Sequence, residues 1–234
     1  MSAVFAKTYP GGICVLTDGA TYNRTGALTR IGPKVWSSET RPVCVFGRGD
    51  HEWMRAIAAE IIGVADRSED FDAVLDWLRG SLPALGPKIG GQTDRIVEIV
   101  VAGHSPRSGF SQYVFYSWSD PTDKAFELKK IDLAWGGARL TAEDWAEIKA
   151  IPMDAFNEGQ PWFEKHGADV FEMVRRKPQR RLFGDGDEQY LVGGQVDLTT
   201  ITDSGVETRT LRRWPDVVGE TINPFKEVEC GSHQ

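Results

Sequence analysis

The chain alternates blocks of strand-like segments with blocks of helix-like segments, instead of single strands with single helices. Apolar runs typical of strands or helices follow one another in this order: strands over 3–46, two helices over 50–78, strands over 96–131, two helices over 141–174 and strands over 190–212. A doubly wound parallel sheet would show one helix after each strand. The order therefore predicts an α+β fold of two mainly antiparallel sheets, with helices on the outside.

The N-terminus predicts a β-hairpin. Two apolar runs, at residues 3–9 and 13–18, flank the turn residues Pro10-Gly11-Gly12. A hairpin with this turn pairs residues whose numbers add up to about 21 to 23. Asp18 or a neighbour is then expected beside Ser2, at the start of the first strand.

Capping residues predict where the helices begin and end. Asp50 and Ser68 stand before two apolar stripes of helical spacing, and Thr141 with Asp144 resembles a capping box. A longer helix should end before Pro178. The segments 196–202 and 207–212, joined at Asp203-Ser204-Gly205, predict a closing hairpin.

One domain accounts for this succession of segments. We see no linker, repeat or shift in composition that would divide it. We predict a single domain over residues 1–213, followed by a polar tail, 214–234, that packs on it or extends from it.

Charge argues against nucleic-acid and membrane partners. The chain has 27 Lys and Arg against 34 Asp and Glu, a formal net charge of −7, which repels phosphate backbones and anionic lipid. Its one basic run, 175–181, is interpreted as a solvated helix C-terminus that complements the helix dipole. No long apolar run or signal peptide is recognisable, so we expect a cytoplasmic protein.

Neither a disulfide framework nor a metal or cofactor site is predicted. The three cysteines, Cys14, Cys44 and Cys230, are odd in number and widely spaced. The four histidines lack the spacing of metal ligands. The segment 88–93 lacks the residue order of a phosphate-binding loop, so no cofactor is expected.

Three residues of the N-terminal third stand at equal intervals. Ser2, Asp18 and Lys34 are sixteen positions apart, and a glycine turn, Gly47-Arg48-Gly49-Asp50, precedes the first helix. A later Gly193-Gly194 precedes a strand. In this pattern the chain resembles the proteasome β-subunit superfamily of N-terminal-nucleophile hydrolases. The resemblance implies a four-layer αββα sandwich, in which two sheets are flanked by helices.

The resemblance also implies a catalytic site. If Met1 is removed, Ser2 presents a hydroxyl nucleophile and a free α-amine, whose ordinary pKa of about 7.7–8.0 suits a general base. Lys34 would lower the pKa of both groups by its charge, and Asp18 would hold Lys34 charged and oriented. The Gly47 amide would donate to the oxyanion.

Two functions remain open at this point. The first is hydrolysis of a peptide or amide substrate by a serine-type enzyme that assembles into a homo-oligomer, as the resemblance implies. The second is a catalytically silent protein that serves as a structural or interaction subunit. Gln189 and Val192 stand where the family has Asp and Ser, and the family's Gly-Ser-Gly has only Trp135-Gly136-Gly137 as a counterpart. A retained Met1 would also block the amine.

Overall fold

A computed structural model describes residues 3–89, 96–148, 158–180 and 188–225. The strands of the first sheet come from three parts of the chain and lie in the order β10-β1-β2-β11-β12. All neighbours in this sheet are antiparallel. The strand bounds are β1 Val4–Tyr9, β2 Gly12–Asp18, β10 Leu133–Gly136, β11 Gln195–Thr202 and β12 Gly205–Arg213.

The second sheet has the order β5-β6-β7-β8-β9 and is also antiparallel. Its strands are β5 Trp36–Ser37, β6 Val43–Gly49, β7 Val97–Ser105, β8 Gly109–Tyr116 and β9 Lys129–Ile131. A third, two-stranded sheet pairs β3 Ala20–Tyr22 with β4 Leu28–Ile31. Four helices are described: α1 His51–Ala65, α2 Phe71–Ile89, α3 Ala142–Glu147 and α4 Gln160–Arg175.

The predicted fold class, a four-layer αββα sandwich built on two sheets, is wrong as stated. The chain is mostly β, with 38% in strands against 27% in helices, and its described strands form three sheets. The third sheet exists because the backbone turns out of the first sheet at Gly19, directly after β2, and β3 pairs with β4 alone. The helices are also unequal, since α3 has only 6 residues.

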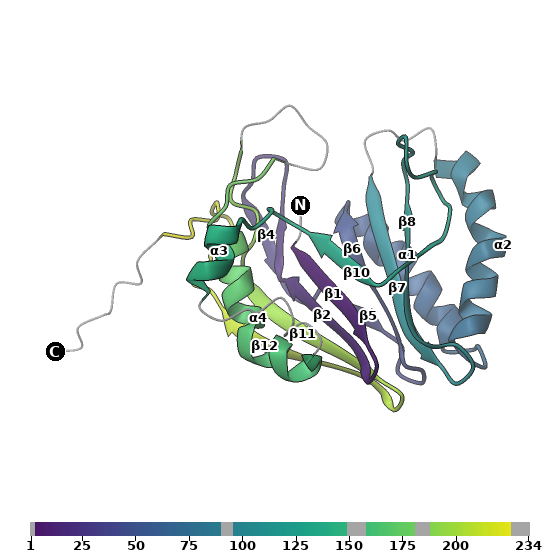
Figure 1. Cartoon of the computed structure of the whole chain (residues 1–234). Helices are drawn as coiled ribbons and strands as arrows, with labels where there is room; N and C mark the ends of the chain where they lie inside the picture. The colour runs from purple at the N-terminus through teal and green to yellow at the C-terminus, as the bar shows by residue number, and fades with distance from the viewer. Residues whose placement is uncertain (1–2, 90–95, 149–157, 181–187, 226–234) are drawn as a thin grey trace.

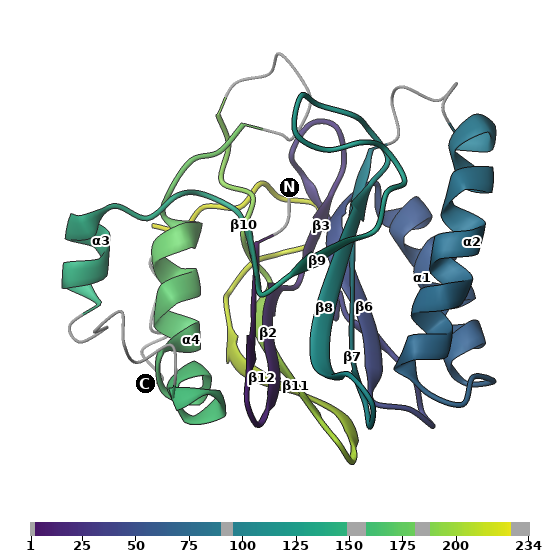
Figure 2. The ribbon, with the colours of Figure 1, turned by 45° about the vertical axis from the view of Figure 1, so that its right-hand side comes forward.

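Apolar side chains fill the space between the two large sheets. Alternate residues of β1 and β2 point to this side, so Val4, Ala6, Ile13 and Val15 are buried there. They meet Cys44 and Phe46 of β6, with Val100, Ala102 and Val114. In Figures 1 and 2 the strands β1 and β2 lie on one side of this core, and β6, β7 and β8 lie on the other.

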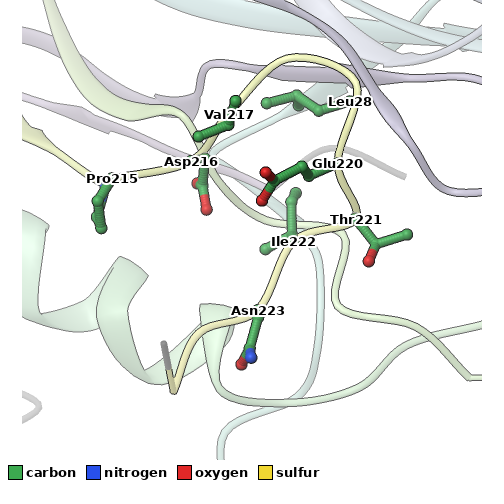
Figure 3. A pocket seen from close by; sticks show the side chains of 8 residues that line it. All are labelled: Leu28, Pro215, Asp216, Val217, Glu220, Thr221, Ile222 and Asn223. Atoms are coloured by element: carbon green, nitrogen blue, oxygen red, sulfur yellow. The ribbon is translucent and has the colours of Figure 1, made fainter. Parts of the chain in front are cut away.

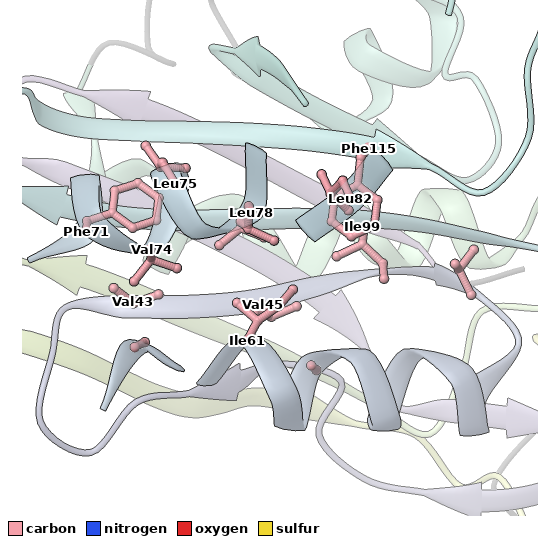
Figure 4. Close-up of a cluster of buried hydrophobic side chains, with 14 of the residues drawn as sticks. Val43, Val45, Ile61, Phe71, Val74, Leu75, Leu78, Leu82, Ile99 and Phe115 are labelled. Carbon is pink, nitrogen blue, oxygen red and sulfur yellow. The ribbon is translucent and has the colours of Figure 1, made fainter. Parts of the chain in front are cut away.

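Helices bury the opposite face of each large sheet. α1 and α2 pack against the second sheet through a cluster that includes Ile61, Phe71 and Leu75 (Figure 4). α4 packs against β2 and β11 of the first sheet, where Phe5 and Leu16 contact its aromatic residues Trp162, Phe163 and Phe171. The two faces of β1 and β2 are therefore both buried, which places the N-terminal hairpin at the centre of the molecule.

The local predictions are largely confirmed. β1 and β2 form the N-terminal hairpin with Val4 opposite Thr17, a register sum of 21. Asp50 caps α1 by accepting from the Trp53 amide, and the Thr141 capping box begins α3. The predicted cap of the second helix was wrong. Asp70 accepts from the Ala73 amide there, whereas the Ser68 hydroxyl donates to the Val64 carbonyl at the end of α1.

The core between the sheets should carry much of the stability. We expect Phe46→Ala to lower the free energy of unfolding by about 3–5 kcal/mol, because a fully buried ring is replaced by a cavity. The matched control is Phe225→Ala, since that ring is 60% exposed and should cost less than about 1.5 kcal/mol. Urea denaturation of both variants checks this, and equal losses would contradict the assignment of this core.

Candidate functional site

A buried ion pair lies at the N-terminal end of β1. Lys34 Nζ is 2.8 Å from Asp18 Oδ1, and the two side chains are 6% and 0% exposed. The same oxygen accepts from the Ala3 amide at 2.9 Å. That amide nitrogen carries the peptide bond to Ser2, which itself lies outside the described residues. The structure thus brings Asp18 and Lys34 together beside Ala3, the residue that follows Ser2 in the chain.

Four donors surround the Asp18 carboxylate. Besides the Ala3 amide and Lys34 on Oδ1, the Ala20 amide donates to Oδ2 at 3.1 Å and the Gly193 amide at 3.4 Å. Hydrogen bonds to an ionised carboxylate favour its charged form. The Asp18 carboxylate is accordingly held by donors from the chain start, from its own loop, from Lys34 and from the late Gly-Gly turn.

Burial governs the protonation of Lys34. Removal from water lowers the pKa of the Lys34 ammonium below its usual value, and the charge and hydrogen bond of Asp18 oppose that shift. A lysine in such an environment is closer to losing its proton at neutral pH than an exposed one. How readily Lys34 keeps its positive charge therefore depends on the Asp18 carboxylate.

Backbone contacts between three glycines bring the two partners together. The Gly32 amide donates to the Gly19 carbonyl at 3.0 Å, and the Gly19 amide donates to the Gly193 carbonyl at 3.1 Å. A Cβ on Gly19 would lie 2.6 Å from Gln195 Cγ and 3.3 Å from the Gly32 carbonyl oxygen. Side chains would keep these loops apart, so glycine allows the Asp18 and Lys34 loops to approach.

Gly47 lies in β6, two residues beyond the last residue that pairs with β5. That last pair is Trp36 with Val45, and Lys34 precedes Trp36 by two residues in the chain. Opposite residues of β6 and β7 alternate between hydrogen-bonded and non-hydrogen-bonded pairs. The Asp50 amide donates to the Ile96 carbonyl and the His104 amide donates to the Pro42 carbonyl, so the even-numbered residues of β6 are the ones hydrogen-bonded to β7.

Gly47 stands at a non-hydrogen-bonded position relative to β7, so its N–H points away from β7, to the side of β6 on which β5 lies. A Cβ on Gly47 would overlap the Glu98 carbonyl oxygen, which explains why a glycine occupies this position. An amide in this orientation suits the predicted donor to an oxyanion.

His51, the first residue of α1, also lies within the field of this pair. Burial lowers the pKa of its imidazole, and the charges of Arg30, Lys34 and Arg55 act in the same direction, whereas Glu52 opposes them. Its Nε2 atom is buried and has no hydrogen-bond partner among the described residues. Sequence reasoning considered His51 only as a metal ligand and missed this proximity.

The late turn lacks the side chains that the resemblance would require. Val192 is fully buried in the apolar cluster under α4, and it carries no hydroxyl. Trp135-Gly136-Gly137 does reach the chain start, since Gly136 pairs with Val4. What sequence reasoning missed is the Gly193 amide, which donates to Asp18 by its backbone. Backbone donors leave no signature in residue type, apart from the glycine itself.

Further features of the described residues bear on function. A small pocket lies on the C-terminal segment, lined by Leu28 and by residues 215–217 and 220–223 (Figure 3).

Among the described residues, no group of three or more His, Cys, Asp or Glu is arranged to hold a metal ion. None of the described helices is both long and apolar enough to cross a membrane.

Comparison with known proteins adds no relative. The chain matches no protein-family model and no curated protein sequence. The function is therefore argued from the site alone.

Removing the Asp18 carboxylate should lower the Lys34 pKa measurably. In Asp18→Asn we expect the Lys34 pKa to fall further, by about 1–3 units, because burial is then no longer opposed by a negative charge. The Cε resonance of ¹³C-labelled lysine measures this. Asp123→Asn, which removes the partner of the exposed Lys129, is the control and should leave Lys34 unchanged. An unchanged Lys34 titration in Asp18→Asn would contradict the pairing.

The same substitution should lower the free energy of unfolding by an amount that depends on pH. We expect Asp18→Asn to lower the free energy of unfolding by about 3–5 kcal/mol at neutral pH, since a buried ammonium loses its counter-charge. A lowered lysine pKa means that the unfolded state binds more protons, so stability rises with pH up to about 10.4. The variant has the lower Lys34 pKa, so its stability rises with pH over a wider range than that of the parent protein. The difference in free energy of unfolding between the two proteins should therefore shrink as the pH rises from the Lys34 pKa of the variant to that of the parent. The NMR titrations supply the two Lys34 pKa values, and a deficit that stays constant between them would contradict this.

Proposed function

We propose that the chain is a serine-type N-terminal-nucleophile hydrolase of peptide or amide bonds. The observation that carries the proposal is the buried Asp18–Lys34 pair, which shares Asp18 Oδ1 with the Ala3 amide at 2.9 Å. A charged pair is costly to bury, and this one lies at the residue next to a potential nucleophile. Removal of Met1 would expose the Ser2 hydroxyl and amine at that place.

The proposed reaction uses Ser2, Lys34, Asp18 and the Gly47 amide. The Ser2 amine takes the proton of the Ser2 hydroxyl, whose oxygen attacks the substrate carbonyl. Lys34 favours the deprotonated forms by its positive charge, and Asp18 holds that charge in position. The Gly47 amide would stabilise the oxyanion, because its N–H points away from β7 and is not used in that ladder. The protonated Ser2 amine returns this proton to the leaving amine of the substrate as the C–N bond breaks, which leaves an ester on Ser2. Water then hydrolyses that ester, releases the carboxylic acid and regenerates Ser2.

A second candidate function is supported by the late turn. Val192 places a buried aliphatic side chain where the resembling family has a hydroxyl that supports its nucleophile. A chain with this replacement and a retained Met1 would be a catalytically silent subunit with a structural or interaction role. The ion pair would then be a remnant of the site that only stabilises the fold.

Assembly into a homo-oligomer and a cytoplasmic location belong to the same proposal. The surface offers large apolar side chains for contacts, since Leu133, Val217 and Val218 are 48%, 49% and 56% exposed. Light scattering on a sizing column would measure the mass in solution, and a monomer would remove assembly from the proposal without affecting the chemistry.

The decisive experiment examines residue 2. The protein is prepared with Ser2 as its N-terminal residue, verified by intact mass, and treated with a β-lactone that acylates N-terminal nucleophiles. We expect a single acyl adduct, located on Ser2 by peptide mass spectrometry, and turnover of a panel of peptide amides. Ser2→Ala should lose at least about 100-fold in turnover, because it removes the nucleophile.

Ser204→Ala is the matched control, since Ser204 lies exposed in the β11–β12 turn. It should retain the adduct and the turnover of the parent protein. If the protein with a free Ser2 is neither acylated nor active, the hydrolase is excluded and the silent subunit is favoured.

A further inference from the structure

A buried ion pair ties the C-terminal segment to the end of α4. The arginine that opens the basic run, Arg175, is only 2% exposed, contrary to the prediction that this run is solvated. Its Nη1 and Nη2 atoms are 2.7 and 2.6 Å from the two carboxylate oxygens of Asp216. The Trp214 ring lies over the same guanidinium, with 4.8 Å between Arg175 Cζ and the ring centroid.

This pair holds the late glycine turn on one side. Arg175 Nη1 donates to the Val192 carbonyl at 2.9 Å, and Asp216 Oδ2 accepts from the Gly194 amide at 2.7 Å. A Cβ on Gly193 would lie 2.5 Å from Asp216 Oδ2 and 2.8 Å from Arg175 Nη1. The contact is therefore direct. Figure 3 shows the Asp216 side chain and its neighbour Ile222 in the segment that brings the carboxylate there.

The opposite side of the turn contacts the candidate site. The Gly193 amide donates to Asp18 Oδ2 at 3.4 Å, and the Gly193 carbonyl accepts from the Gly19 amide at 3.1 Å. The turn is thus clamped between two buried ion pairs, Arg175–Asp216 and Lys34–Asp18. Its position fixes a donor to Asp18 and covers that carboxylate from water.

We propose that the Arg175–Asp216 pair is a positioning element of the candidate site. It presses the Gly193–Gly194 turn onto Asp18 and so keeps the carboxylate oriented toward Lys34. The catalytic meaning of this role rests on the proposed function, but the effect on Lys34 does not. The C-terminal segment that carries Asp216 is then a part of the site and not a dispensable tail.

The test replaces the pair without changing net charge. Arg175→Met combined with Asp216→Leu removes both charges, so no unpaired ion is left buried. The turn loses its clamp, Asp18 is held less firmly toward Lys34, and the Lys34 pKa should fall further below its ordinary value, by about 0.5 unit or more, because the carboxylate then opposes the effect of burial less. The ¹³C resonance of Lys34 measures this, and it does not require activity.

The matched control is Arg212→Met combined with Asp169→Leu. This pair is also formed between α4 and the C-terminal half of the chain, at 2.8 Å, but its side chains are 36% and 53% exposed and it does not contact the turn. It should leave the Lys34 titration unchanged. A milder variant, Arg175→Lys, keeps both charges and loses the two-pronged contact, so a smaller fall of the Lys34 pKa is expected.

The outcomes separate the two proposals. A lowered Lys34 pKa in the Arg175 variants, with an unchanged control, supports the positioning role whether or not Ser2 is acylated. If Ser2 is acylated, the pH profile of acylation should move with Lys34 in the same variants. A Lys34 titration like that of the parent protein in a folded Arg175 variant, or an equal shift in the control, would overturn the role.

Discussion

The Asp18–Lys34 ion pair is the interaction on which the arrangement of the surrounding loops depends. A buried ammonium and a buried carboxylate each cost several kcal/mol if left alone, so the fold must keep them in contact and must satisfy the remaining carboxylate lone pairs. It does so with the amides of Ala3, Ala20 and Gly193. The chain start, the β2–β3 loop and the late turn are therefore all bound to one carboxylate.

Close backbone packing makes this convergence possible. Gly32, Gly19 and Gly193 lie in a row, joined by two amide-to-carbonyl hydrogen bonds. A Cβ on Gly19 would clash with Gln195 Cγ and crowd the Gly32 carbonyl oxygen, so a larger residue there would push these loops apart. The second ion pair, Arg175–Asp216, closes this row from the other side through Val192 and Gly194. Charge and glycine thus act together, since the glycines permit the approach that the charges require.

The position of this cluster explains why it is a candidate for chemistry and not only for stability. It lies where β1 begins and where β2 ends, and Gly47, near the end of β6, turns its N–H away from β7 to the side of the sheet on which β5 lies. The apolar core between the two large sheets holds these strand ends in place. A rigid support of this kind is what a preorganised site needs, because the donors must not rearrange when charge develops.

The sequence by itself determined the local elements and the candidate residues. The turn at Pro10-Gly11-Gly12 fixed the register of the first hairpin, and Asp50 and Thr141 set helix starts, because hairpin turns and caps act over a few residues. The spacing of Ser2, Asp18 and Lys34 pointed to one place in the fold.

Only the tertiary structure decided how distant segments combine. The separate β3–β4 sheet overturned the predicted fold class, and its pairing depends on where the backbone leaves the first sheet, which no local pattern records. Arg175 had the sequence context of a solvated helix end. It is buried because Asp216, 41 residues later, returns to meet it. Long-range contacts of this kind depend on the assembled backbone, so residue types alone cannot reveal them.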